Sequence, residues 1–149
     1  MKNSILIIIV TLIFATSCKE NTSKKVIKSK VEKVNEIPFS GTWARSFTMG
    51  KGVDAKVTYT VFQDSIQYIM NGPMVMKYTL VKDAFLSKSN RWIGKRGETP
   101  YVIFFKNVSK DSITLLKMKV ESKEKAIKMA FPSDTARSKF SSWNTFKKK

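Results

Sequence analysis

The feature that most constrains the fold is an alternation of apolar and polar residues that runs through residues 38–149. Val57, Tyr59 and Val61 alternate with two threonines and a lysine, and Asn71-Gly72-Pro73 supplies a strong turn signal. Period-two patterning with turns at short intervals is typical of β-strands that bury one face. Strands are expected over residues 41–48, 55–62, 66–70, 74–80, 84–87, 91–93, 101–106, 113–120, 127–131 and 143–146.

The number and order of these segments favour one architecture. About eight or nine strands among these ten short segments, mostly in hairpin order, predict an all-β fold, a small antiparallel up-and-down β-barrel. No segment has the length or period of the helix that connects parallel strands, and a closed barrel leaves no unpaired sheet edge. Ser133-Asp134 is a candidate cap for one short C-terminal helix over residues 135–140. A chain of 149 residues holds one such domain, over residues 38–149.

The N-terminal residues predict export and lipidation. An apolar run over residues 5–14 follows Lys2; about ten apolar residues suit a signal peptide, whereas a spanning helix needs roughly 20. The run ends in Ala15-Thr16-Ser17-Cys18, which resembles a lipobox, although Ala15 stands where leucine is usual. We expect residues 1–17 to be a signal peptide and Cys18 to carry acyl chains such as palmitate, which anchor the protein to a membrane. The alternative is an ordinary secretory signal followed by a chance cysteine.

Residues 18–37 are polar and rich in lysine, without glycine or aromatic residues. Like charges keep such a segment extended, so it is expected to be a tether between the lipid and the domain. A short helix over residues 25–34 is a second expectation. Lys19 follows the cysteine where aspartate commonly signals retention in the inner membrane. The expected location is therefore the cell envelope, with the outer membrane favoured over the inner one.

Three stretches resemble lipocalins and related lipocalin-like bacterial lipoproteins. Phe39-Ser40-Gly41-Thr42-Trp43 contains the G-x-W motif that opens the first strand of those barrels. The later stretches are similar to a late hairpin and to the last strand of the family: residues 101–105 with 111–116, and residues 143–147. The resemblance implies that Trp43 packs at the closed end of the barrel beneath a basic side chain, for which Arg137 and Lys147 are the two candidates.

The composition speaks against catalysis and against metal binding. The chain has no histidine and a single cysteine, so no Ser-His or Cys-His pair and no Cys/His metal site can form. Each carboxylate of the domain falls in or beside an expected turn, where it satisfies local backbone groups: Asp54, Asp64, Asp83, Glu98, Asp111, Glu121, Glu124 and Asp134. We therefore expect no enzyme, metal site or cofactor. A role for a lysine as a nucleophile is not excluded by the composition, but nothing in the sequence singles out one lysine for it.

Methionines recur in the strand pattern and suggest a pocket lining. Methionine is flexible and polarizable, which suits a pocket for an apolar ligand. An eight-stranded barrel can enclose one small molecule or fill itself with side chains, and both alternatives stay open. The candidate lining consists of Met70, Met74, Met76, Tyr78, Met118 and Met129.

The chain has a formal charge of +17, which comes mainly from lysine. Lysines on expected outward positions could contact anionic lipid headgroups or polysaccharide: Lys56, Lys77, Lys106, Lys117, Lys119, Lys128 and the tail 147–149. The alternative is that the charge serves solubility alone. Nucleic acid is not an expected partner, because the chain is exported and has few arginines for base readout.

Two functions follow from the sequence. The first is a membrane-anchored lipoprotein whose barrel binds a small apolar or amphipathic ligand at the cell envelope. The second is a structural or interaction lipoprotein with a filled barrel, whose basic surface contacts anionic envelope components or a partner protein. A cavity open at one end would favour the first, and a solid core would favour the second. A buried lysine inside the cavity would revive catalysis as a third possibility.

Overall fold

The computed structural model describes residues 37–138 and 141–149. The expected signal peptide, the lipidation site Cys18 and the tether up to residue 36 lie outside these residues. No helix in the described part of the chain is both long enough and apolar enough to cross a bilayer.

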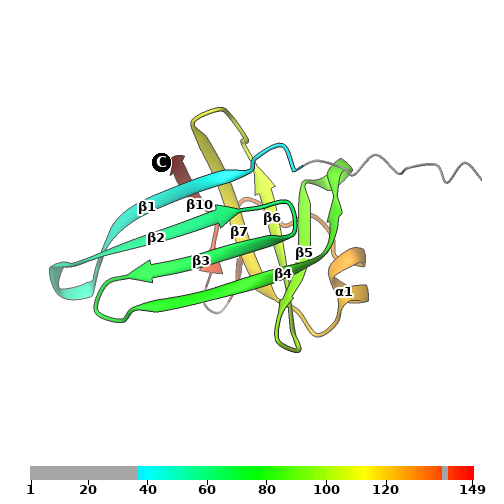
Figure 1. The fold of residues 1–149 in the computed structure, drawn as a ribbon, viewed down its shortest axis with the longest axis horizontal. Coiled ribbons are helices and arrows are strands. Elements are labelled where there is room, and N and C mark those ends of the chain that lie inside the picture. The colour runs from blue at the N-terminus through cyan, green and yellow to red at the C-terminus, as the bar shows by residue number, and fades with distance from the viewer. Residues whose placement is uncertain (1–36, 139–140) are drawn as a thin grey trace, which may run out of the picture. The chain divides into compact units, whose positions relative to one another are not determined.

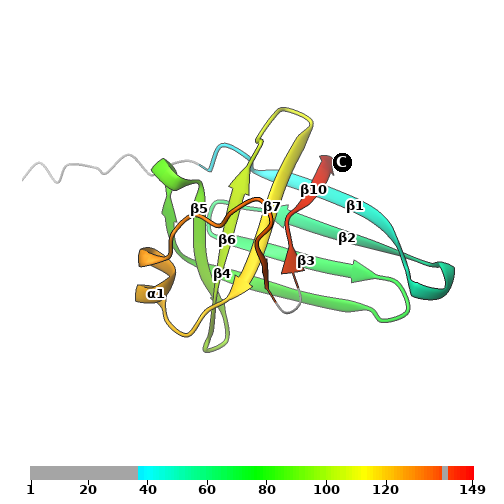
Figure 2. The same ribbon diagram turned by 180° about the vertical axis from the view of Figure 1, so that it is seen from behind.

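Eight antiparallel strands of the described residues close into a barrel (Figures 1 and 2), which confirms the expected all-β fold. Around the barrel the order is β1-β10-β7-β6-β5-β4-β3-β2, so each strand lies beside its neighbour in sequence until β10 closes the ring between β7 and β1. The strands are β1 (Gly41–Met49), β2 (Val53–Val61), β3 (Ser65–Asn71), β4 (Met76–Leu86), β5 (Arg91–Arg96), β6 (Thr99–Lys106), β7 (Ser112–Lys119) and β10 (Asn144–Lys148).

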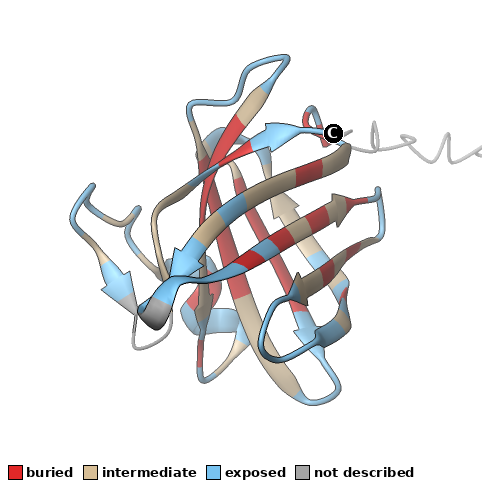
Figure 3. Cartoon of the chain, turned by 90° about the vertical axis from the view of Figure 1, so that its left-hand side faces the viewer, coloured by how far each residue is buried: buried red, intermediate tan, exposed pale blue. Residues whose placement is uncertain are grey.

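The alternation in the sequence sets which residues of β2, β3 and β4 face the interior. Tyr59 lies opposite Tyr68, and Tyr68 lies opposite Tyr78. Because side chains of paired residues share a face of the sheet, all three tyrosines lie on the same face. Buried residues alternate with exposed or half-buried ones along β2 and β3 (Figure 3). The hairpin order therefore stacks one aromatic residue from each strand on the inner wall.

One end of the barrel is plugged by the residues that precede β1. Phe39 packs against Phe105, with ring centroids 4.1 Å apart, and Trp43 is buried with its indole N–H donating to the carbonyl of Phe39 at 2.9 Å. The cation nearest to the Trp43 ring is Lys148, whose Nζ lies 5.7 Å from the ring centroid. The expectation of Arg137 or Lys147 in this role was wrong: Trp43 pairs with Lys148 across β1 and β10, so the neighbouring residue, Lys147, is offset from the ring.

The chain between β7 and β10 covers part of the outer surface of the barrel. It contains α1 (Lys123–Lys128), which contacts β5 and β6, and a small sheet of β8 (Arg137–Ser138) and β9 (Ser141–Ser142). The expected strand over residues 127–131 was wrong, because the Ser122 side chain accepts from the Lys125 amide and caps a helix there instead. The helix expected over residues 135–140 was also wrong, since a turn at residues 134–135 leads into β8.

Candidate functional site

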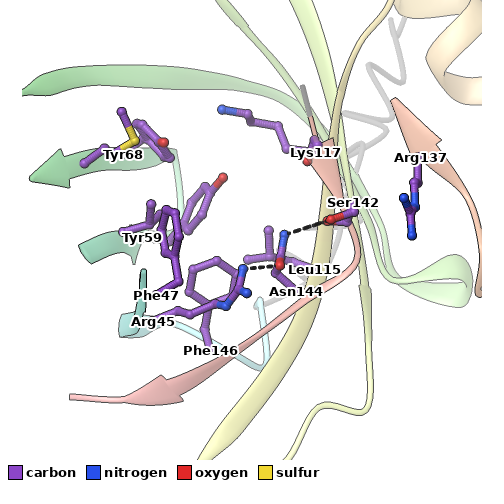
Figure 4. Close-up of a pocket in the computed structure, with 13 residues that line it drawn as sticks. Arg45, Phe47, Tyr59, Tyr68, Leu115, Lys117, Arg137, Ser142, Asn144 and Phe146 are labelled. Carbon is purple, nitrogen blue, oxygen red and sulfur yellow. Dashed lines mark hydrogen bonds between the residues drawn. The ribbon is translucent and has the colours of Figure 1, made fainter. Parts of the chain in front are cut away.

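A cavity of about 490 Å³ lies in the barrel beyond the plugged end. Its walls come from β1, β2, β3, β7 and β10, and residues of β8 and β9 border it on one side (Figure 4). Pockets for small molecules are usually about 300–1,000 Å³ in size. The barrel is therefore partly hollow, with space for a ligand.

Aromatic rings form much of the wall of this cavity. Tyr59 packs edge-on against Tyr68 and Phe146, with centroids 5.1 Å and 5.2 Å apart. Tyr68 also stacks on Tyr78 at 4.7 Å, and Phe47 contributes a further ring to the lining. Together these rings offer a stiff apolar surface to a ligand.

Three cationic side chains line the same cavity: Arg45, Lys117 and Arg137. Arg45 donates a hydrogen bond to the side-chain oxygen of Asn144, and its guanidinium carbon lies 5.2 Å from the ring centroid of Phe47. Figure 4 shows Arg137 on the far side of Asn144 from the rings, so it borders the cavity at its edge. None of the carboxylates in residues 37–138 and 141–149 lines the cavity.

Lys117 extends from β7 into the interior, on the side of the cavity where Tyr68 of β3 lies (Figure 4). Its Nζ lies 4.3 Å from the ring centroid of Tyr68, 4.9 Å from that of Tyr78 and 5.9 Å from that of Tyr101. The amine also donates a hydrogen bond to the Tyr78 hydroxyl. Three of the chain's four tyrosines thus surround one lysine.

The surroundings of Lys117 disfavour its charged form. Burial, reinforced by the positive charge of Arg96, lowers the pKa of Lys117 to about 8. Burial also raises the pKa of Tyr59, Tyr68 and Tyr78 above the ordinary value for tyrosine, which keeps their hydroxyls protonated at neutral pH. The site therefore combines a weakly held proton on the lysine with strongly held protons on the phenols.

The structure brings some of the predicted lining residues together. Met70 lines the cavity and packs against the inner core. Met76 lies opposite Met70 in the sheet, and Tyr78 packs against the same core and contacts Lys117. Met74 lies in the turn between β3 and β4, where it is 66% exposed. Only Met70 of the six predicted residues borders the cavity itself.

Two of the predicted lining residues lie on the other side of the sheet. Met118 and Met129 pack in an outer cluster with Val102, Phe104 and Ala126, beneath α1. Their assignment to the barrel interior was wrong. Strand β7 buries both of its faces, so the apolar character of Met118 does not indicate which face is the inner one.

The same ambiguity affected Lys117, which was expected to point outward. Ile113 and Leu115 precede it on the inner face, while Leu116 and Met118 lie on the covered outer face. Arg45 was not identified as a site residue at all. The available signal was its spacing, since it follows the inward-facing Trp43 by two positions and precedes Phe47 by two.

Comparisons with protein-family models, with curated proteins and with solved structures find no match for this chain. The described residues hold no group of three or more metal-ligating side chains placed around one point. The geometry and chemistry of the cavity are therefore the basis for a functional assignment.

Proposed function

We propose that this protein binds a small anionic molecule with an apolar body inside its barrel, at the surface of a membrane in the cell envelope. The observation that carries the proposal is the combination of Arg45 and Lys117 with aromatic walls and without a carboxylate lining the cavity in the described part of the chain. A cation in a partly apolar cavity is stabilised by an anionic group that enters with the ligand.

The size and lining of the cavity support an apolar body for this ligand. Rings of Phe47, Tyr59, Tyr68 and Phe146 together with Met70 would contact the carbon chain or ring system. The polar groups converge at one side: the Asn144 amide donates to the Ser142 carbonyl at 2.9 Å while its oxygen accepts from Arg45. Apolar walls combined with convergent polar groups are typical of small-molecule sites.

We further propose that the chain is a lipocalin-like lipoprotein held through Cys18, without enzymatic turnover. Support comes from the closed up-and-down barrel, from Trp43 at the plugged end with Lys148 over its ring, and from the lipobox-like sequence before Cys18. Two or three acyl chains hold a protein firmly on a bilayer. The ligand would then be taken up at a membrane, where amphipathic acids collect.

A second candidate function is contact with anionic lipid or polysaccharide through the exterior of the barrel. Lys56, Lys77 and Lys119 are exposed on the strands, and Lys147 and Lys148 follow on β10. Each lysine near an anionic membrane contributes about 1 kcal/mol of attraction. This contact is compatible with a ligand in the interior and does not need a filled barrel.

The proposal is tested by calorimetric titration of the purified full chain with decanoate and with decanol. Both probes have the same apolar chain, and only decanoate carries a negative charge. We expect tighter binding of decanoate, and a loss of about tenfold or more in its affinity in Arg45→Met, because a hydrogen bond to a charged group is worth about 1.5–3 kcal/mol. Decanol affinity should stay within twofold in this variant.

Lys77→Met is the matched control, because it removes one positive charge from an exposed position on β4. It should leave decanoate affinity unchanged. Equal affinities for decanoate and decanol in the wild type, or equal losses in Arg45→Met and Lys77→Met, would refute an anion site in the cavity.

A further inference from the structure

The amine of Lys117 is placed as a nucleophile usually is. It lies inside a cavity, within 5 Å of the ring centroids of Tyr68 and Tyr78, and no carboxylate of the described residues borders that cavity. A lysine becomes nucleophilic at neutral pH when it is desolvated or lies near another cation, because both effects favour the neutral amine. Both conditions are present at Lys117, where Arg96 is the neighbouring cation.

Charged and titratable groups that lie near the amine or line the same cavity come from six strands of the barrel. They are Arg45 of β1, Tyr59 of β2, Tyr68 of β3, Tyr78 of β4, Arg96 of β5 and Tyr101 of β6. The phenols are neutral near pH 7, and the two arginines are positive. Burial and the positive charge of Arg96 outweigh the attraction of the tyrosine faces for the ammonium form, so the pKa of Lys117 falls to about 8.

We infer that Lys117 captures an aldehyde or ketone with an apolar body by forming a reversible imine. This inference rests on the proposed function, because the carbonyl compound would occupy the same cavity as the amphipathic ligand. It adds a covalent mode of binding and a carbonyl as the ligand class.

The chemistry balances without an additional oxidant or reductant. The neutral Nζ forms a bond to the carbonyl carbon, and the π electrons of the C=O bond move to oxygen. A proton passes from nitrogen to that oxygen, which gives a carbinolamine. The C–O bond then breaks as the C=N bond forms, and the oxygen leaves as water with both protons of the original amine. Addition of water reverses the sequence and releases the ligand.

Tyr78 is a positioning residue for this step. The amine donates a hydrogen bond to the Tyr78 hydroxyl oxygen, so the lone pair of the neutral amine remains free to point at a carbonyl carbon. The raised pKa of Tyr78 keeps its hydroxyl neutral, so it does not stabilise the ammonium form as a phenolate would.

The test uses the full chain, decanal as the probe and cyanoborohydride to reduce any imine to a stable secondary amine. Peptide mass mapping then gives the labelled position. A pKa lowered from 10.5 to about 8 leaves Lys117 with a neutral fraction roughly two orders of magnitude larger than that of an ordinary lysine at pH 7. We expect labelling at Lys117 at least about tenfold faster than at any other lysine, and suppression of that labelling by excess decanoate.

Lys117→Arg keeps the positive charge but cannot form the imine, so fast labelling should disappear; near-UV circular dichroism checks that it folds. Lys77→Arg is the matched exposed control and should label as the wild type does. Tyr78→Phe should slow labelling at Lys117 several-fold without moving it to another position.

The outcomes separate the inference from the proposed function. Decanoate binding with decanal spread evenly over the lysines would overturn the imine and leave the binding function standing. Selective labelling at Lys117 without decanoate binding would support the imine and overturn the anion site. If neither probe engages the cavity, both are refuted. Decanoate protection in the wild type keeps the test decisive if Lys117→Arg does not fold.

Discussion

Lys117 is the residue at which stability and function conflict most directly. A partly buried amine loses hydration, and within the described part of the chain a hydrogen bond to Tyr78 and the faces of three tyrosine rings replace it. Cation–π contacts contribute up to about 2 kcal/mol when desolvated. The retention of such a group inside a barrel that apolar side chains could fill is the kind of local conflict expected at a functional site.

This conflict has a pH signature. The pKa of Lys117 is about 8 in the folded protein and near 10.5 in an unfolded chain, so between these values the unfolded state binds more protons and stability rises with pH. We expect the stability of the wild type relative to Lys117→Met to increase by about 2 kcal/mol from pH 7 to pH 9.5. Urea unfolding at both pH values measures this difference.

The measurement stays below pH 10 because, above it, the buried tyrosines change the stability in the opposite direction. Burial raises the pKa of Tyr59 above the ordinary tyrosine value of 10.0, so the folded state keeps protons that the unfolded state loses, and stability falls as pH rises further. Lys119→Met, an exposed change on the same strand, should follow the wild type across the window. If the free energies of unfolding of the wild type and Lys117→Met differed by the same amount at pH 7 and pH 9.5, the lowered pKa of the buried amine would be refuted.

The sequence could not assign Lys117 to the interior for a physical reason. The alternation of apolar and polar residues identifies the inner face of a strand only where the other face is exposed to solvent. The outer face of β7 is covered by the chain that follows it, so Leu116 is as buried as Ile113. Where one face of the sheet is wet, as in β2, the inner residues Val57, Tyr59 and Val61 were identified correctly. The sequence pattern alone therefore does not show which side chains of β7 face the cavity.

At the scale of secondary-structure elements, α1 is held by one arginine. The Arg91 Nη1 donates to the carbonyls of Ala126 and Ile127 at 2.8 Å and 2.6 Å, near the C-terminal end of the helix, and its guanidinium carbon lies 4.9 Å from the Phe104 ring centroid. A cation at this end of a helix also meets the negative end of the helix dipole. Helix and barrel are therefore joined by a buried polar contact.

Arg91→Met should lower the free energy of unfolding by about 2–3 kcal/mol, because the buried Ala126 carbonyl and the partly buried Ile127 carbonyl lose their charged donor. Hydrogen exchange of the α1 amides should accelerate more than exchange in β2 or β3. The control is Lys95→Met, an exposed position on the same strand. A loss in Arg91→Met no larger than in Lys95→Met would show that the contact does not hold the helix.

A glycine in β5 makes space for a tryptophan ring. A Cβ on Gly94 would collide with the Val81 carbonyl oxygen and with the Trp92 ring, and the register of β4 against β5 shifts beside it, between Lys82 and Ala84. Gly94→Ala should therefore cost about 3 kcal/mol or more, since the backbone of β4 cannot yield as a side chain would. Thermal unfolding measures the loss.

Gly50→Ala is the matched control for this change, because nothing lies within 4 Å of a Cβ at Gly50. Its melting temperature should stay within a few degrees of the wild type. Similar melting temperatures for both variants would mean that β4 and β5 accommodate a methyl group between them.

The elements that the sequence failed to predict are those outside the barrel. Residues 127–131 alternate as a strand would, yet Ser122 caps a helix that buries Ala126 against the outer face of β5 and β6. A local cap and a tertiary contact override the weak alternation there. The hairpins from β1 to the start of β4 were predictable because each turn and each inner face has its own local signal. The break expected between strands 74–80 and 84–87 was wrong, because β4 is continuous and only shifts its register between Lys82 and Ala84.

For the whole molecule, the proposed lipid anchor at Cys18 predicts how the protein distributes between membrane and solution. Cys18→Ala should abolish fatty-acid labelling of the chain and move it from the membrane fraction to the soluble fraction, because the acyl chains supply the membrane affinity. Metabolic labelling with a palmitate analogue and fractionation measure both effects. Unchanged labelling and fractionation would refute the lipoprotein.

Binding of an amphipathic acid in the cavity is tested most directly by native mass spectrometry of the wild-type protein and of Arg45→Met, each purified from the membranes of the cells that make it. The cavity of about 490 Å³ between Arg45 and the aromatic wall should retain one small molecule, which denaturation releases and which proves to be an acid with an apolar body. We expect the occupied fraction to fall about tenfold in Arg45→Met. A wild-type protein that carries no molecule, or one that carries only a neutral molecule equally retained by Arg45→Met, would contradict the account.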